Sequence, residues 1–211
     1  MSYVSLFVGW LLGILNTLLI DRLTKHCKKQ EVKKALLTEL DDVRVRLAGT
    51  IYKISSRLGT LNKHLMSWTF KIFAERGSIE VTREDMEAMA KIEKMSAAEI
   101  QTMVDAIVSK QGQAALSLKK FFLPFLDSNL SHLPLFDVKF QSLVLEIRTK
   151  LTLLNEEIEL GRFFYEKTFD SSLTTENHRI VTDNLNELYR KVAEMAQLTA
   201  DKITELIENY V

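Results

Sequence analysis

The hydrophobic pattern predicts helices along most of the chain. After residue 35, apolar positions recur three or four residues apart, which is the spacing of one helix face. Two such runs, 135–169 and 176–211, are separated by a short polar turn, which predicts two antiparallel helices. The apolar positions of the three runs are Leu36, Leu40, Val43, Leu47, Ile51, Ile54, Leu58, Leu61, Leu65, Trp68 and Ile72; Phe140, Val144, Ile147, Leu151, Leu154 and Ile158; and Val181, Leu185, Leu188, Val192, Met195 and Ile203.

The first of these runs predicts one long helix that ends at Gly77, about 70 Å beyond the first apolar segment of the chain. The middle predicts shorter helices: one over 83–95, one that begins with the capping box Ser96–Glu99 and ends near Gly112, and one from about Ala114 to Leu126. Long apolar faces do not stay apart in water, so we expect an elongated bundle of three long and about three short helices.

Residues 3–20 form an apolar run without a charged residue, and as a helix they would measure roughly 27 Å, close to the thickness of a bilayer core. A signal peptide is disfavoured because no basic region precedes the run and no small-residue cleavage site follows it. A buried core helix is the other alternative. The pattern therefore predicts an all-α protein with a transmembrane span at 1–21, a basic juxtamembrane segment at 22–34 and a helical bundle at 35–211.

Basic residues follow the run immediately, and the positive-inside rule places this side in the cytoplasm. We therefore expect a single-pass protein of the inner (cytoplasmic) membrane, with its N-terminus outside and most of the chain in the cytoplasm. The basic residues would also contact anionic lipid head groups. They are Arg22, Lys25, Lys28, Lys29, Lys33 and Lys34.

Small residues are spaced four apart within the run, and on a helix they would form one stripe. Such a stripe lets two helices approach closely in lipid, and a neighbouring amide can hydrogen-bond across them. The stripe predicts self-association of the span. Its residues are Ser5, Gly9, Gly13 and Thr17, with Asn16 beside them.

Composition and short motifs narrow the range of functions further. The 211 residues carry 28 basic and 28 acidic side chains, so a net charge of zero gives no direct signal for nucleic acid. One Cys excludes an internal disulfide framework, and the four His lie in no metal-binding motif. Phosphate-binding glycine motifs and the GxSxG motif are absent from the sequence. We therefore expect no cofactor, no metal and no enzymatic activity.

One spacing offers an enzymatic alternative. Arg57 and His64 are separated by six residues and resemble the Arg-polar-x(n)-His motif of the HEPN ribonucleases, which are small helical bundles. The motif match is incomplete because Leu58, an apolar residue, follows Arg57. In layout, one N-terminal span and a cytoplasmic bundle resemble the small membrane accessory effectors of bacterial antiviral (CRISPR-associated) systems, some of which carry degenerate HEPN-like bundles and assemble into pores.

Three functions follow from these observations. The first is a non-enzymatic homo-oligomeric membrane effector whose spans surround an opening, triggered by a cytoplasmic protein or nucleoprotein. The second is a membrane-anchored helical scaffold or adaptor. The third is a HEPN-type ribonuclease that uses Arg57 and His64. The expected partners are membrane lipid and further copies of the chain.

Overall fold

The computed structural model describes residues 3–76, 91–92, 94–111 and 116–210, and every regular element within them is a helix. The all-α fold class is therefore confirmed. The helix expected over 83–95 lies mostly outside the described residues. The elements are α1 (Tyr3–Leu58), α2 (Lys63–Arg76), α4 (Ala97–Gln111), α5 (Pro124–Ser128), the 3₁₀ helix η1 (Leu130–Leu135), α6 (Val138–Lys167) and α7 (Thr175–Tyr210).

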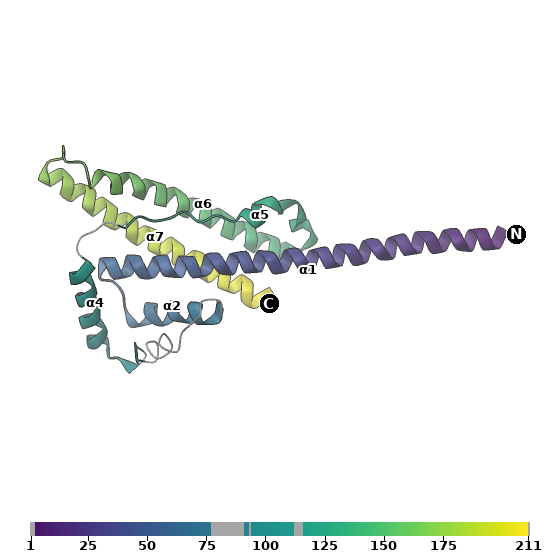
Figure 1. The fold of residues 1–211 in the computed structure, drawn as a ribbon, viewed down its shortest axis with the longest axis horizontal. Coiled ribbons are helices and arrows are strands. Elements are labelled where there is room, and N and C mark those ends of the chain that lie inside the picture. Colours follow the sequence, from purple (N-terminus) through teal and green to yellow (C-terminus); the bar gives the residue numbers. More distant parts are fainter. Residues whose placement is uncertain (1–2, 77–90, 93, 112–115, 211) are drawn as a thin grey trace.

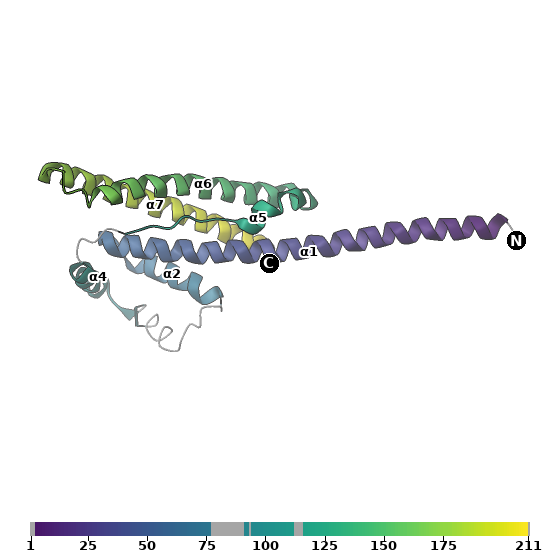
Figure 2. The ribbon, with the colours of Figure 1, turned by 45° about the horizontal axis from the view of Figure 1, so that its top comes forward.

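The body of the molecule is a three-helix bundle in which α7 packs against both α1 and α6 (Figure 1). The α2 helix packs on α1, and α4 lies across the far end of α1 (Figure 2). The three long helices expected from the pattern are thus present. The N-terminal part of α1 extends away from the body as a single straight helix (Figures 1 and 2).

The core follows the predicted periodicity. On α6, all six predicted apolar positions are buried. On α7, Leu185, Leu188, Val192 and Ile203 are buried. These side chains belong to one hydrophobic cluster that extends along α1, α6 and α7. Because each buried side chain of this size stabilises the fold by about 1.5–3 kcal/mol, the cluster holds the three helices together.

The prediction of one helix ending at Gly77 is wrong, because α1 ends at Leu58. Gly59 has a φ of 68°, the left-handed conformation that ends many helices. The backbone N–H groups of Thr60 and Leu61 donate to the Ser55 carbonyl, and Asn62 caps α2 by accepting a bond from the Leu65 N–H. Leu61 and Leu65, after this turn, are buried and continue the apolar spacing of α1. The sequence pattern therefore gave no sign that the helix ends at Leu58.

Side chains cap several helix ends. Ser96 and Glu99 form the predicted capping box, with the Ser96 N–H 2.7 Å from the Glu99 carboxylate. The Asn177 N–H donates to the Thr174 hydroxyl at 3.3 Å, at the start of α7. At the start of α6, Asp137 accepts a bond from the Phe140 N–H at 2.9 Å. Each cap satisfies a backbone donor that the first helical turn leaves without a partner.

The helix predicted from about Ala114 to Leu126 is also wrong for most of its length, because residues 116–123 form no helix or strand. We call this segment the strap. Phe121 and Leu123 are buried while Phe122 is exposed, the alternation of an extended chain. Side chains replace the missing backbone partners: the Tyr189 hydroxyl bonds both the N–H and the C=O of Leu116, and the Asn155 amide does the same for Phe121.

The N-terminal part of α1 makes no buried contact that the structure describes before Val32. Phe7, Trp10 and Ile20 are each at least 60% exposed. Most other side chains of residues 3–20 lie outside the described set. Among the side chains that are described, no helix combines the length and the apolar character needed to cross a membrane.

Candidate functional site

The strongest concentration of polar and aromatic contacts lies where α1 enters the body. We define the bundle base as Lys29, Lys33, Phe136, Asp137 and Tyr210. The Lys29 ammonium lies 5.7 Å from the centre of the Phe136 ring, and the Lys33 ammonium lies 5.7 Å from the centre of the Tyr210 ring. Both distances suit cation–π attraction. The base therefore joins α1, the segment before α6 and the end of α7.

Asp137 is the central acceptor of the base. Its Oδ1 accepts from the Phe140 N–H and from the Tyr210 hydroxyl, the latter at 2.8 Å. The Phe140 N–H, followed by the Tyr210 hydroxyl, lowers the pKa of the Asp137 carboxyl below its ordinary value of 3.8. Burial, followed by the bond to Asp137, raises the pKa of the Tyr210 phenol. The carboxylate is thus ionised at neutral pH and fixes both helix ends.

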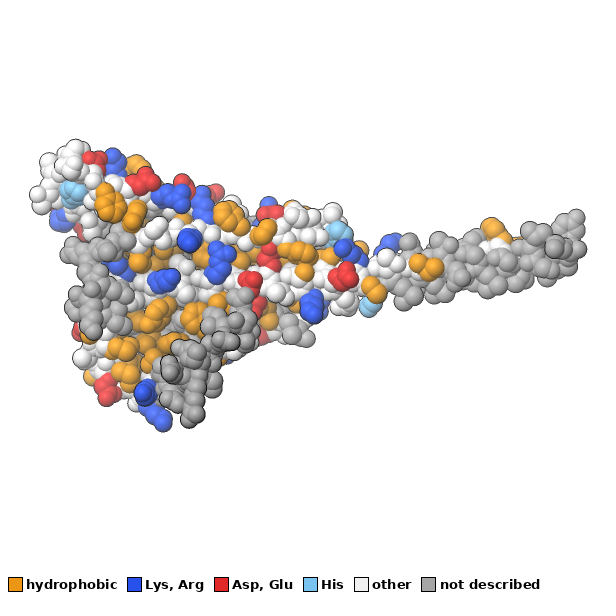
Figure 3. Space-filling view, in the orientation of Figure 1, with side chains coloured by type: hydrophobic (Ala, Val, Ile, Leu, Met, Phe, Trp, Pro, Cys, Tyr) orange, Lys and Arg blue, Asp and Glu red, His pale blue; other side chains and the backbone are white. Residues whose placement is uncertain are grey.

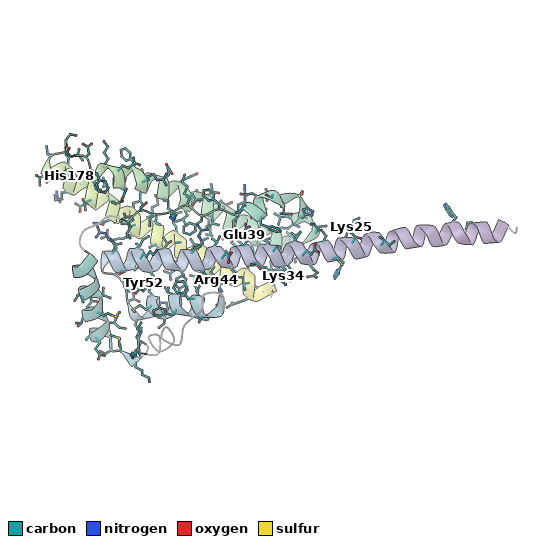
Figure 4. The ribbon with its side chains drawn as sticks, viewed as in Figure 1. Lys25, Lys34, Glu39, Arg44, Tyr52 and His178 are labelled. Carbon is teal, nitrogen blue, oxygen red and sulfur yellow. The ribbon has the colours of Figure 1, made fainter. Side chains whose placement is uncertain are left out.

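A groove of about 760 Å³ lies beside the base, between α1 and the last turn of α7. Lys33, Lys34 and Tyr210 line it, together with Asp41 and Arg44. Figure 4 labels Lys34 and Arg44 on α1. The described residues that line the groove carry both signs of charge and hydroxyl or amide groups, and none of them forms a pair of a nucleophile beside a base.

Arg44 forms the ionic centre of this groove and is only 4% exposed. It is paired with Asp41 at 2.7 Å and with Glu75 at 3.0 Å. Its Nη1 also lies 3.4 Å from the Thr204 hydroxyl. Because an unpaired buried charge is costly, these partners are needed to keep the guanidinium in the interior. The result is a polar clamp that joins α1, α2 and α7.

The basic residues predicted for lipid contact divide into two groups. Lys29 and Lys33 are half-buried and lie over the aromatic rings of the base. Lys25, Lys28 and Lys34 are exposed. The side chain of Arg22 lies outside the described residues. The prediction of head-group contact stays a prediction for all six.

The residues predicted to pack in the span are helical in their backbone, but their side chains lie outside the described residues. They are Ser5, Gly9, Gly13, Asn16 and Thr17.

The sequence predicted one continuous helix that contains both Arg57 and His64. In the structure the two residues lie on different helices. Arg57 is half-buried in the last turn of α1, while His64 is exposed in the first turn of α2. The turn at Gly59 separates them and changes the direction of the chain. A catalytic role for this pair stays a prediction.

Sequence reasoning missed the aromatic and acidic partners at the base. Asp137 precedes the apolar run of α6, which is a recognisable capping signal. No comparable signal pointed to Phe136, Tyr210 or the burial of Arg44, because their partners come from distant parts of the chain.

No group of three His, Cys, Asp or Glu side chains is placed to hold a metal ion within the described part of the chain. Comparisons with protein-family models, with curated proteins and with solved structures found no match.

Proposed function

We propose that this protein is a non-enzymatic, single-span membrane protein that homo-oligomerises, and that its spans surround an opening in the inner membrane. Its N-terminus would lie outside and its bundle in the cytoplasm. The layout-level resemblance to membrane effectors of bacterial antiviral systems supports a role in defence by depolarising the membrane. The trigger would be a cytoplasmic protein or nucleoprotein that binds the open assembly more tightly than the closed one.

The observation that carries this proposal is the projecting N-terminal part of α1. Phe7, Trp10 and Ile20 are exposed, and the nearest described core residue of α1 is Val32. A helix in a protein gains its stability mainly from packing, so an apolar segment with no described partner in its own chain calls for lipid or another copy. As a helix, residues 3–20 are long enough to cross the hydrocarbon core of a lipid bilayer.

The continuity of α1 supports a mechanical link between the span and the bundle. The helix passes without a break from Tyr3 to Leu58, and the bundle base holds it through Lys29 and Lys33. A tilt of the bundle would therefore be passed to the span. The polar candidates to line the opening are Ser5, Asn16 and Thr17, and the remaining apolar surface would gate by dewetting.

Native mass spectrometry of the full chain in mild detergent tests the proposal. We expect a closed ring of roughly six or more copies, since cyclic assemblies need enough helices to enclose a lumen. The double variant Gly9→Leu with Gly13→Leu should lower the mass to monomer or dimer, because larger side chains hold the helices apart.

The matched control is Leu11→Phe with Leu15→Phe, which enlarges two side chains at the same spacing on the opposite helix face. It should keep the mass of the ring, and the ring should then conduct ions in planar bilayers. A monomeric or dimeric parent protein would contradict the proposal.

The second candidate is a membrane-anchored scaffold, and one observation favours it. The turn between α6 and α7 projects beyond the end of α1 (Figure 1). Phe169 in this turn is 70% exposed, and Phe163 near the end of α6 is 54% exposed. Exposed aromatic side chains are enriched where proteins bind one another. A monomeric or dimeric mass in the experiment above would favour this candidate.

A further inference from the structure

A second groove, separate from the bundle base, lies between α1 and the strap and has a volume of about 320 Å³. Figure 3 shows Lys and Arg side chains on the face of the body between α1 and α6. One wall of the groove is α1, with Arg46, Thr50 and Lys53, and the other is the strap, with Ser117 and Lys119.

The described charged residues that line the groove are all basic. Arg46 and Lys53 are seven residues apart and therefore lie on the same face of α1, while Lys119 stands on the opposite wall. All three side chains are exposed, and no Asp or Glu is among the described residues that line the groove. A cleft lined by one sign of charge concentrates ions of the other sign.

Two neighbouring cations, by contrast, have acidic partners. Lys120 is paired with Glu159 at 2.6 Å, and Arg148 is paired with Asp127 at 2.8 Å. Lys53 and Lys119 form no ion pair with another described residue. The groove thus brings together two ammonium groups and one guanidinium. A multiply charged anion would be attracted to all three positive charges at once.

Arg46 is already oriented for such a ligand. Its guanidinium lies 5.3 Å from the centre of the Phe121 ring, and Nη2 donates to the Lys120 carbonyl at 3.3 Å. These contacts use one of the five N–H donors and leave the others available. A planar guanidinium stacked on an aromatic ring is a frequent means of binding phosphate.

The strap makes the groove rigid before any ligand arrives. The Tyr189 hydroxyl lies 2.8 Å from the Leu116 nitrogen and 2.7 Å from its oxygen. The Asn155 amide lies 2.8 Å from the Phe121 nitrogen and 2.7 Å from its oxygen. Both ends of the strap are therefore held by α6 and α7, and a preorganised site loses less entropy on binding.

We propose that this groove binds a small ligand with several phosphate groups, such as a nucleotide or a short polyphosphate. Its volume lies at the lower end of small-molecule sites. Phosphates of lipid head groups are out of reach if residues 3–20 span the membrane, because Arg46 lies about 39 Å further along α1. The ligand would therefore come from solution, and it would act on the bundle rather than on the span.

Isothermal titration calorimetry on the full chain in non-ionic detergent tests this inference, with inorganic tripolyphosphate and ATP as probes. The double variant Lys53→Ala with Lys119→Ala should weaken binding of both probes at least about tenfold, since each lost charge-assisted contact costs roughly a factor of ten. The matched control is Lys91→Ala with Lys94→Ala, which removes the same charge from exposed positions elsewhere and should bind as the parent does.

A second variant, Arg46→Lys, keeps the charge but removes the planar fork, and it should also weaken binding. Circular dichroism would verify that each variant keeps its helical content. ATP binding about tenfold tighter than tripolyphosphate would identify a nucleotide site, and equal affinities would identify a site for phosphate alone. The inference is overturned if neither probe binds at millimolar concentration, or if the two double variants lose affinity equally.

Discussion

At the scale of single residues, the interior depends on a few polar side chains with several partners each. Arg44 binds Asp41 and Glu75 across two helices. Glu39 on α1 accepts from the N–H groups of Phe125 and Leu126 at 2.7 and 2.9 Å, at the start of α5. The Glu39 contacts tie the first turn of α5 to a long helix, and they pair backbone N–H groups that would otherwise lack an acceptor.

Asp137 gives a pH prediction at this scale. Its pKa is lowered in the folded protein, so its contribution to stability is complete above its ordinary pKa of 3.8 and is lost as pH falls through the folded value. Asp137→Asn keeps a capping oxygen but does not titrate.

We expect the wild type to be more stable than Asp137→Asn near pH 6, and the difference to shrink as pH falls below 4. Urea denaturation of both proteins across this pH range measures the difference in their free energies of unfolding. The other carboxylates titrate in both proteins, so their effect on stability drops out of this difference. A difference that stays constant with pH would show that the charge of Asp137 does not stabilise the fold.

At the scale of elements, one glycine determines the length of the first helix. Gly59 adopts the left-handed conformation, and the chain reverses so that α2 packs on α1. Gly49 lies within α1 and has helical geometry, and an added methyl group there would meet only the Phe73 ring at 3.8 Å. Gly49 therefore lies within the helix without being needed for its geometry, whereas Gly59 ends the helix.

Substitution by alanine distinguishes the two positions. Gly59→Ala should lower the free energy of unfolding by about 1–2 kcal/mol, because an L-residue is strained in the left-handed conformation. Gly49→Ala should raise it by about 0.5–1 kcal/mol, since alanine favours the helix. Chemical denaturation followed by circular dichroism measures both, and equal effects of the two substitutions would contradict this account of the turn.

At the scale of the whole molecule, the described core lies apart from the projecting part of α1. Every buried side chain that the structure describes lies at or after Val32, and the bundle base holds α1 from Lys29 onward. The projecting helix thus adds no described core contact to the body.

A chain that begins at Leu23 should therefore fold without detergent, remain helical and unfold cooperatively with heat. Size-exclusion chromatography and thermal circular dichroism in aqueous buffer measure this, with the full chain as the comparison. Aggregation or loss of helix in the shortened chain would mean that residues 1–22 contribute to the core, which would contradict this prediction.

The sequence by itself determined the helical class, the long helices α6 and α7 and the buried face of each, because a periodic apolar pattern dictates which side chains leave water. It did not determine the turn at Gly59, since the apolar spacing runs on through it. It also did not determine the strap or the basic groove, because these depend on Tyr189, Asn155 and Arg46 meeting residues far away in the chain. Local patterns encode burial, whereas such polar contacts exist only after the helices have packed.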